Sequence, residues 1–149
     1  MIYSPLVKKA MLLAYEAHYG QFDKSGYPYI HHPLHLAEQM QTEYETVTAL
    51  LHDVAEDTEV TFEDMKRQGI PEEVIQALQL LCHEDGVPYF DYIRNMRENE
   101  IALHVKRADL MHNMDESRLP EQKRSPERMA KYAEALNMVE SFLTELKNF

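Results

Sequence analysis

Apolar residues recur along this chain at intervals of three and four positions, which is the spacing of one face of an α-helix. The first such stripe follows Ser4 and Pro5, a pair typical of an N-cap and a first helical turn, and it ends before Gly20. A loop rich in Gly and Pro, GQFDKSGYPYIHHP, comes next. The pattern then predicts a second helix from about Pro33 and a third over residues 46–54.

The second half of the chain shows the same period. Thr61 followed by Asp64 predicts a capping box at the start of a helix that ends at Gly69. Another helix is predicted over residues 71–82, and the segments VPYFDYIRNMREN and EIALHVKRADLMHNM predict two more. The tail over residues 126–146 predicts the last helix, and no alternating pattern predicts a strand.

Length and composition fit this pattern. The chain has 149 residues, 44% of them apolar, which suits one domain over residues 1–149 with a real core. We therefore predict an all-α fold, a compact multi-helix bundle of about seven or eight helices. No apolar run approaches the roughly 20 residues of a membrane span, no signal-peptide pattern is visible, and the single Cys82 excludes an intrachain disulfide. These features predict a cytoplasmic protein without a membrane partner.

The net charge is acidic, at −11 by formal count. This argues against a nucleic-acid partner, which would require a basic face. If the ligand carries phosphate, something must offset the acids locally, and a divalent cation would do so. The sequence leaves the oligomeric state open.

The stretch ALLHDVAEDTE ends an apolar run with His52 and Asp53 and then places Glu56 and Asp57 close behind. One interpretation is a solvated helix end. The other is a functional site, which we favour because like charges crowded at one point cost stability unless something compensates them. Acids at the rim of such a site could orient a water molecule and move protons.

Two distant segments contain further candidates for metal ligands. His32 lies in YIHHP at the start of a helix, although a lone histidine is more often structural or exposed. Asp109 lies within the apolar pattern of VKRADLMHNM, where an acid is costly unless it is paired or bound to metal. It could instead cap a neighbouring helix or pair with a lysine. With His52 and Asp53 they form a nitrogen and oxygen set suited to Mn²⁺, Fe²⁺ or Zn²⁺. Four ligands leave open positions on a six-coordinate ion, as in catalytic sites.

The order H…HD…D resembles that of HD-domain phosphohydrolases. More narrowly, GQFDKSGYPYIHHP, TALLHDVAEDTEVTFEDM and VKRADLMHNM resemble the hydrolase domain of RelA/SpoT-type proteins, over about residues 5–119. Those domains remove the 3′-pyrophosphate of guanosine tetra- and pentaphosphate with Mn²⁺. The resemblance implies an HD-domain bundle, a stand-alone small hydrolase and a small-molecule nucleotide substrate.

The resemblance also implies roles for single residues. Four residues match the metal ligands of that family: His32, His52, Asp53 and Asp109. Glu56 and Asp57 match an acidic pair that activates the attacking water. Lys24 matches a basic residue near the substrate, and Asn113 matches an asparagine that contacts the nucleoside.

Two positions depart from the family pattern. Asp23 stands where those hydrolases generally place an arginine that stacks on guanine, and we expect an acid there to repel phosphates. Leu110 replaces a typical basic residue. Arg94 and Arg97 are weaker candidates for neutralising phosphate. Two alternatives therefore stay open: an HD-type 5′-nucleotidase, and a non-catalytic nucleotide-binding module of the same fold.

Overall fold

The computed structural model describes residues 1–148, and within them the protein is all-α, which confirms the predicted fold class. The α-helices are α1 (Pro5–Ala17), α2 (His31–Glu38), α3 (Glu43–Leu51), α4 (Val54–Asp57), α5 (Phe62–Arg67), α6 (Glu72–Leu81), α7 (Tyr89–Arg94), α8 (Glu100–Met114) and α9 (Pro126–Lys147). Two 3₁₀ helices, η1 (Glu116–Arg118) and η2 (Glu121–Lys123), connect α8 to α9. None of the helices in this range is both long enough and apolar enough to cross a membrane.

Local sequence signals set several helix boundaries as predicted. The Ser4 hydroxyl accepts a hydrogen bond from the Val7 backbone N–H at 3.0 Å, which caps α1. Thr61 and Asp64 form the reciprocal capping box at the start of α5. Gly20, in the turn after α1, has a φ of +80°, a conformation that glycine adopts without strain.

The third predicted helix has different bounds in the structure. It begins earlier than predicted because the Thr42 side chain caps it by accepting from the Glu45 N–H. It also ends earlier, because Asp53, with φ −102° and ψ −3°, leaves the helical path before α4 begins. This break makes α4, a helix of four residues, separate from α3; the other eight α-helices of residues 1–148 agree with the seven or eight predicted. The break also means that His52 and Asp53 lie between two helices rather than on one.

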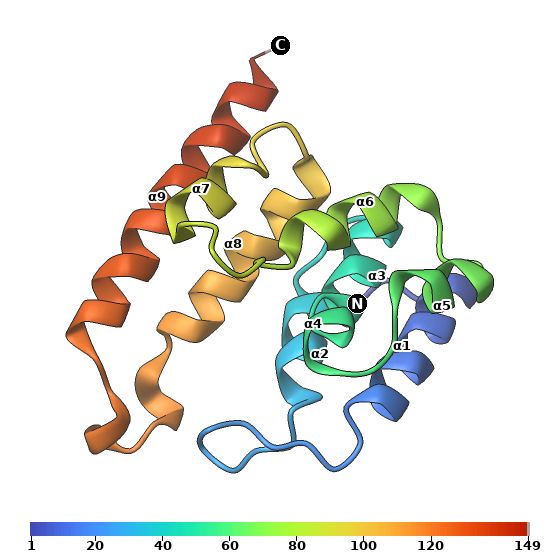
Figure 1. Cartoon of the computed structure of the whole chain (residues 1–149), viewed down its shortest axis with the longest axis horizontal. Helices are drawn as coiled ribbons and strands as arrows, with labels where there is room; N and C mark the ends of the chain where they lie inside the picture. Colours follow the sequence, from blue (N-terminus) through green and yellow to red (C-terminus); the bar gives the residue numbers. More distant parts are fainter. Residues whose placement is uncertain (149) are drawn as a thin grey trace.

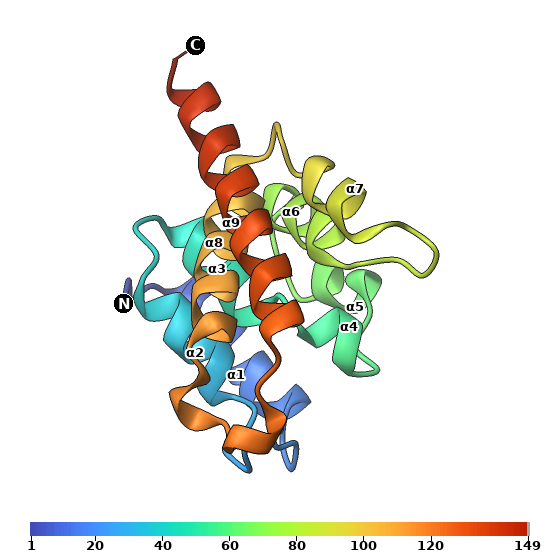
Figure 2. The ribbon, with the colours of Figure 1, turned by 90° about the vertical axis from the view of Figure 1, so that its left-hand side faces the viewer.

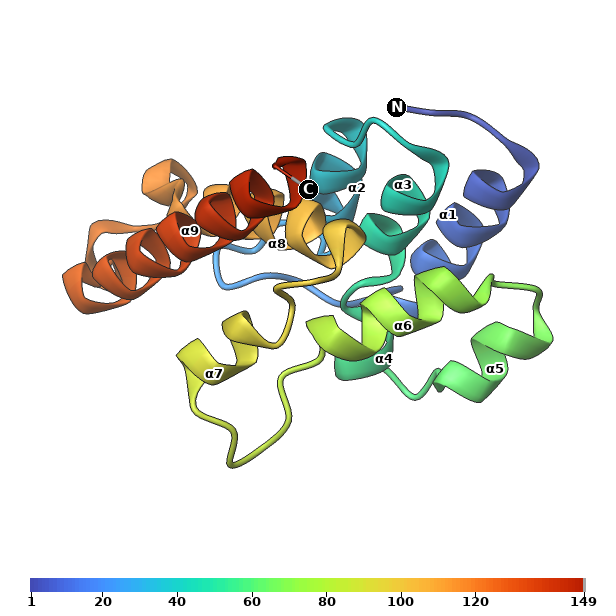
Figure 3. The same cartoon turned by 90° about the horizontal axis from the view of Figure 1, so that it is seen from above.

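Helix α3 is the centre of the bundle. It contacts α1, α2, α6 and α8, and its residues from 45 to 51 are all buried. Helices α8 and α9 lie side by side along one flank of the molecule (Figure 1), and a quarter turn shows α9 lying across α8 (Figure 2). Seen from above, α7, α6 and α5 follow one another along one edge (Figure 3). The central position of α3 places its C-terminal end, and therefore His52, deep in the protein.

Two connections meet at one end of the bundle. The loop between α1 and α2 and the segment between α8 and α9 both lie at the lower edge of Figure 1. The Arg118 guanidinium donates to Asp23 at 3.1 Å, and the Lys123 ammonium donates to the Lys24 carbonyl at 2.6 Å. These contacts join segments about 95 residues apart in sequence and form one wall of the pocket described below.

Core packing around α3 gives a direct test of the fold. We expect Leu50→Ala to lower the free energy of unfolding by about 2–5 kcal/mol, because the Leu50 side chain is fully buried and its removal leaves a cavity. The matched control is Leu12→Ala in α1, where the side chain is 61% exposed and the loss is expected to stay within about 0.5 kcal/mol. Urea unfolding followed by circular dichroism measures both. Equal losses for the two variants would contradict the described core.

Candidate active site

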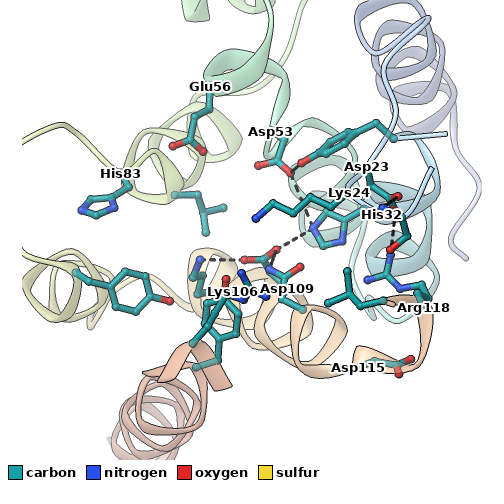
Figure 4. Close-up of a pocket in the computed structure, with 18 of the residues that line it drawn as sticks. Asp23, Lys24, His32, Asp53, Glu56, His83, Lys106, Asp109, Asp115 and Arg118 are labelled. Atoms are coloured by element: carbon teal, nitrogen blue, oxygen red, sulfur yellow. Dashed lines mark hydrogen bonds and ion pairs between the residues drawn. The ribbon is translucent and has the colours of Figure 1, made fainter. Parts of the chain in front are cut away.

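Three segments that are remote in sequence bring two histidines and two aspartates together. His32 lies in the first turn of α2, His52 and Asp53 lie at the break between α3 and α4, and Asp109 lies in α8. Figure 4 shows His32, Asp53 and Asp109 facing one another. One ligand atom each of His32, His52 and Asp109 lies within 4.8 Å of the others. Asp53 Oδ2 lies 3.0 Å from His52 Nε2 and 3.9 Å from His32 Nε2. The three segments therefore form one cluster that could hold a divalent metal ion.

The environment of His52 shows that the cluster suits a cation. Its Nδ1 lies 2.7 Å from the Ala49 carbonyl oxygen, an acceptor, so Nδ1 carries the proton and a neutral ring keeps its lone pair on Nε2. That Nε2 is buried and makes no well-formed hydrogen bond within residues 1–148. It faces the carboxylates of Asp53 and Asp109, at 3.0 and 3.7 Å. Lone pairs that face carboxylate oxygens in a buried space require a positive charge between them. That charge is either a metal ion or a proton on Nε2: although burial lowers the pKa of His52, Asp53 and Asp109 raise it well above its ordinary value.

Asp109 is held by two other residues of α8. Lys106, one turn earlier, donates to Oδ2 at 2.9 Å, and Asn113, one turn later, donates to Oδ1 at 3.2 Å. Lys106 and Asp109 are both buried, so each offsets the cost of burying the other's charge. These contacts fix the Asp109 carboxylate in the orientation that faces the histidines.

Asp53 is held from the loop before α2. The Tyr29 hydroxyl donates to Asp53 Oδ2 at 2.5 Å and lies 3.3 Å from Asp57 Oδ2. Burial raises the pKa of this phenol, as do the carboxylates of Asp53 and Asp57, so Tyr29 keeps its proton and acts as a donor. No local pattern signals this role of Tyr29, apart from its position three residues before His32.

The charges of the cluster reinforce one another. When His52 Nε2 carries a proton in place of a metal ion, burial raises the pKa of Asp53, but the positive charge of His52 prevails and lowers the pKa to about 2. Burial likewise opposes ionisation of Asp109, whereas the Lys106 charge holds the pKa of that carboxyl well below its usual value. Both carboxylates are therefore ionised at neutral pH, which is the state that binds metal.

A pocket of about 450 Å³ opens beside the cluster, a size that accommodates a small-molecule ligand. In Figure 4, Asp23 and Arg118 lie on one side of the cluster and the Lys24 side chain extends from that side toward Asp53 and Asp109, whereas Glu56 and His83 lie on the other side. Five carboxylates and four cationic side chains line the pocket: Asp23, Asp53, Glu56, Asp109 and Asp115, with Lys24, Lys106, Arg118 and Arg128. The pocket lining therefore has a net negative charge, which would repel a polyanionic ligand unless a bound metal ion made the net charge positive.

The two acids predicted to activate water lie in different surroundings. Glu56 lines the pocket, and burial raises the pKa of its carboxyl, with the charge of Asp53 adding to the effect. Asp57 lines a separate depression beside Gln21, whose side chain donates to the Asp57 carbonyl at 3.2 Å. The geometry thus brings Glu56 to the pocket and leaves Asp57 in contact with the metal cluster through Tyr29.

The cationic residues around the pocket differ in part from those expected. Lys24 lines the pocket, and its ammonium group makes no ion pair within residues 1–148. Arg94 and Arg97, expected as weaker candidates, do not line it: they pair on the surface with Asp91 and Glu145. Arg94 ends α7, Arg97 follows three residues later, and both side chains are exposed.

The carboxylate of Asp23, which we expect to repel phosphate, has partners of its own within the pocket wall. Its Oδ1 accepts from the backbone N–H groups of Ser25 and Tyr27, at 2.8 and 3.0 Å, and its Oδ2 accepts from Arg118 at 3.1 Å. The carboxylate is therefore engaged in ordering its own loop and in an ion pair. The role of Arg118 was not predicted from the sequence because Arg118 lies 95 residues from Asp23, and no local pattern signals such a pairing.

Comparison with known proteins finds relatives of the SpoT type. No family model matches the chain. It is 36% identical over 123 residues to the bifunctional (p)ppGpp synthase/hydrolase SpoT of Escherichia coli K12, covering 72% of this chain and 17% of that protein. It is 31% identical over 127 residues to the guanosine-3′,5′-bis(diphosphate) 3′-pyrophosphohydrolase of Borreliella burgdorferi, covering 71% of this chain and 18% of that protein. The chain thus spans less than a fifth of the length of these relatives.

A solved structure extends the likeness to the fold. It comes from a study of a metazoan ortholog of SpoT that hydrolyses ppGpp, and it aligns with a TM-score of 0.71 and 23% sequence identity, covering 96% of this chain and 88% of that one. The resemblance predicted from the motifs is therefore confirmed: the chain is homologous to a segment of the SpoT-type proteins and shares the fold of a metazoan SpoT ortholog.

Proposed function

We propose that this chain is a metal-dependent phosphohydrolase that cleaves a pyrophosphate or phosphate ester of a nucleotide. The observation that carries the proposal is the buried Nε2 of His52, which faces two ionised carboxylates beside a pocket of ligand size. The names of the relatives favour the 3′-pyrophosphate of guanosine tetra- or pentaphosphate as the group removed.

His32, His52, Asp53 and Asp109 would hold the ion. Imidazole nitrogens with carboxylate oxygens favour Mn²⁺, with Fe²⁺, Zn²⁺ and Mg²⁺ as alternatives. When bound, a divalent ion polarises a phosphoryl oxygen and lowers the pKa of a water molecule. The protein fixes the ligand atoms in advance, because Tyr29 holds Asp53 and α8 holds Asp109.

Glu56 is the residue best placed to take a proton from the attacking water. Its carboxylate lines the pocket, and burial raises its pKa above the ordinary value, which makes it a stronger base. Asp57 contributes less directly, because its carboxylate contacts Tyr29 and lies outside the pocket lining.

Lys24 and Asn113 would contact the substrate. The Lys24 ammonium, without an ion pair in the described chain, can neutralise a phosphate group. Asn113 donates its N–H to Asp109, and its amide oxygen accepts no hydrogen bond within residues 1–148, so that oxygen is available to a nucleoside hydroxyl.

Loss of a ligand carboxylate tests the metal centre. We expect Asp53→Ala and Asp109→Ala each to abolish Mn²⁺ binding in isothermal titration calorimetry, together with turnover, because each removes an anionic ligand. Asp91→Ala is the matched control, since that carboxylate is exposed and, within residues 1–148, its ion-pair partner is Arg94 alone. Full metal-dependent activity in either ligand variant would refute the assignment.

Replacement of Glu56 separates proton transfer from metal binding. We expect Glu56→Gln to lower kcat about 10²- to 10⁴-fold while the affinity for Mn²⁺ changes little, because the amide keeps the shape but cannot accept a proton. Glu63→Gln in α5, at an exposed position, is expected to leave kcat unchanged. If kcat survives in the Glu56 variant, another group must act as the base.

The product identifies the reaction. With Mn²⁺ in excess, we expect guanosine tetraphosphate to release one pyrophosphate per nucleotide, and we expect EDTA to stop the release because it removes the ion. Ion chromatography distinguishes pyrophosphate from orthophosphate. Orthophosphate from a nucleoside monophosphate would instead indicate a 5′-nucleotidase. A nucleotide-induced thermal shift without any product would indicate a binding module.

A further inference from the structure

His112 forms a direct hydrogen bond with one of the proposed metal ligands. Its Nδ1 lies 2.7 Å from Nδ1 of His32, and the planes of the two rings differ by only 10°. Both side chains are buried, with 5% and 8% exposure. The established resemblance assigns no role to His112, and the proposed reaction does not use it.

The two nitrogens of His32 are held by residues one turn apart on α8. Nε2 lies 2.8 Å from Asp109 Oδ1, and Nδ1 faces His112, three residues further along the helix. This arrangement gives α8 control over both edges of one imidazole ring. It also links the proton positions on the two rings, because a hydrogen bond between two Nδ1 atoms needs one donor and one acceptor.

Two neutral arrangements satisfy this contact. In the first, His112 donates from Nδ1, and His32 carries its proton on Nε2 and donates it to Asp109. In the second, His32 donates from Nδ1 to His112, and the lone pair of His32 Nε2 is free toward the cluster. Each ring carries one proton in both cases. In passing from the first to the second, His32 gives up its Nε2 proton, the shared Nδ1 proton crosses to His32, and His112 gains a proton on Nε2.

Only the second arrangement lets His32 act as a metal ligand, since a nitrogen that bears a proton has no lone pair to offer. We propose that His112 is a positioning residue that accepts the Nδ1 proton of His32 and thereby fixes the tautomer of His32 that binds metal. The inference rests on the proposed metal centre. Such partners of metal-bound histidines typically change metal affinity by about 10- to 100-fold.

The surroundings of His112 make this role specific. The rings of His35 and His31 lie near it, with centroids at 4.2 and 5.6 Å, but neither forms a hydrogen bond with His112 within residues 1–148. His32 is therefore the partner for His112 Nδ1 in the described chain. An acceptor at the same place, rather than an aromatic ring, is what the inference requires.

Two variants distinguish the acceptor from the ring. We expect His112→Phe, which keeps a ring but has no acceptor, to weaken Mn²⁺ binding about 10- to 100-fold in calorimetry. We expect His112→Asn to recover most of the affinity, because the side-chain oxygen of asparagine can take the place of Nδ1 and accept from His32. His31→Asn is the control, since His31 is exposed and bonds no ligand, and its affinity should match that of the wild type.

The histidine tautomers of the wild-type protein can be measured directly, so this test does not depend on whether a variant folds. In ¹⁵N NMR of the Zn²⁺-loaded protein, we expect His32 to carry its proton on Nδ1 and His112 to carry its proton on Nε2. A proton on His112 Nδ1 in the loaded protein, or wild-type affinity in folded His112→Phe, would overturn the inference. Absence of metal binding in the wild type itself would instead overturn the proposed function.

Discussion

The site depends on one constraint: buried hydrogen-bond acceptors face each other at its centre. The lone pair of His52 Nε2 is directed toward the carboxylates of Asp53 and Asp109, and the fold holds them together at distances of 3.0 and 3.7 Å. Buried charges of this kind cost several kcal/mol each unless they are compensated. The protein therefore carries a built-in preference for a positive charge at this point, and a divalent cation satisfies more of these acceptors at once than a proton can.

The surrounding helices make this arrangement possible by satisfying the outer side of each residue. The Ala49 carbonyl holds His52, Tyr29 holds Asp53, and Lys106 holds Asp109. These partners come from different elements, so the geometry of the centre is a property of the whole bundle rather than of one motif. Because α3 is buried on all sides, movement of its C-terminal end would disturb packing against four other helices.

Sequence reasoning reached the fold and the residues of the cluster for identifiable reasons. The 3.6-residue period and the caps at Ser4 and Thr61 are local signals, and they predicted the helices well. An acid within an apolar helical pattern, Asp109, was visible because burial of an unpaired charge is improbable. The break at Asp53 was not predicted, since it depends on a single backbone conformation without a Gly or Pro nearby. The supporting contacts of Tyr29 and Arg118 were missed because long-range pairs have no periodic signature.

The contact between Asp23 and Arg118 shows that the charge of one residue in the sequence predicts the local electrostatics less well than the summed charge of its neighbours in the fold. Taken alone, Asp23 adds a negative charge to the mouth of a pocket that should receive phosphate. In the structure, its carboxylate accepts hydrogen bonds from two backbone N–H groups and from Arg118. Arg118 lines the same pocket from the connection between α8 and α9. The pair is close to neutral, so Lys24 beside it supplies the positive charge that the loop between α1 and α2 offers to a ligand. A relative with a cation at the position of Asp23 and a neutral residue at that of Arg118 would present a more positive wall. The charge at this end of the pocket is therefore the sum of the charges on the α1–α2 loop and on the α8–α9 connection. Only the folded chain brings these two segments together.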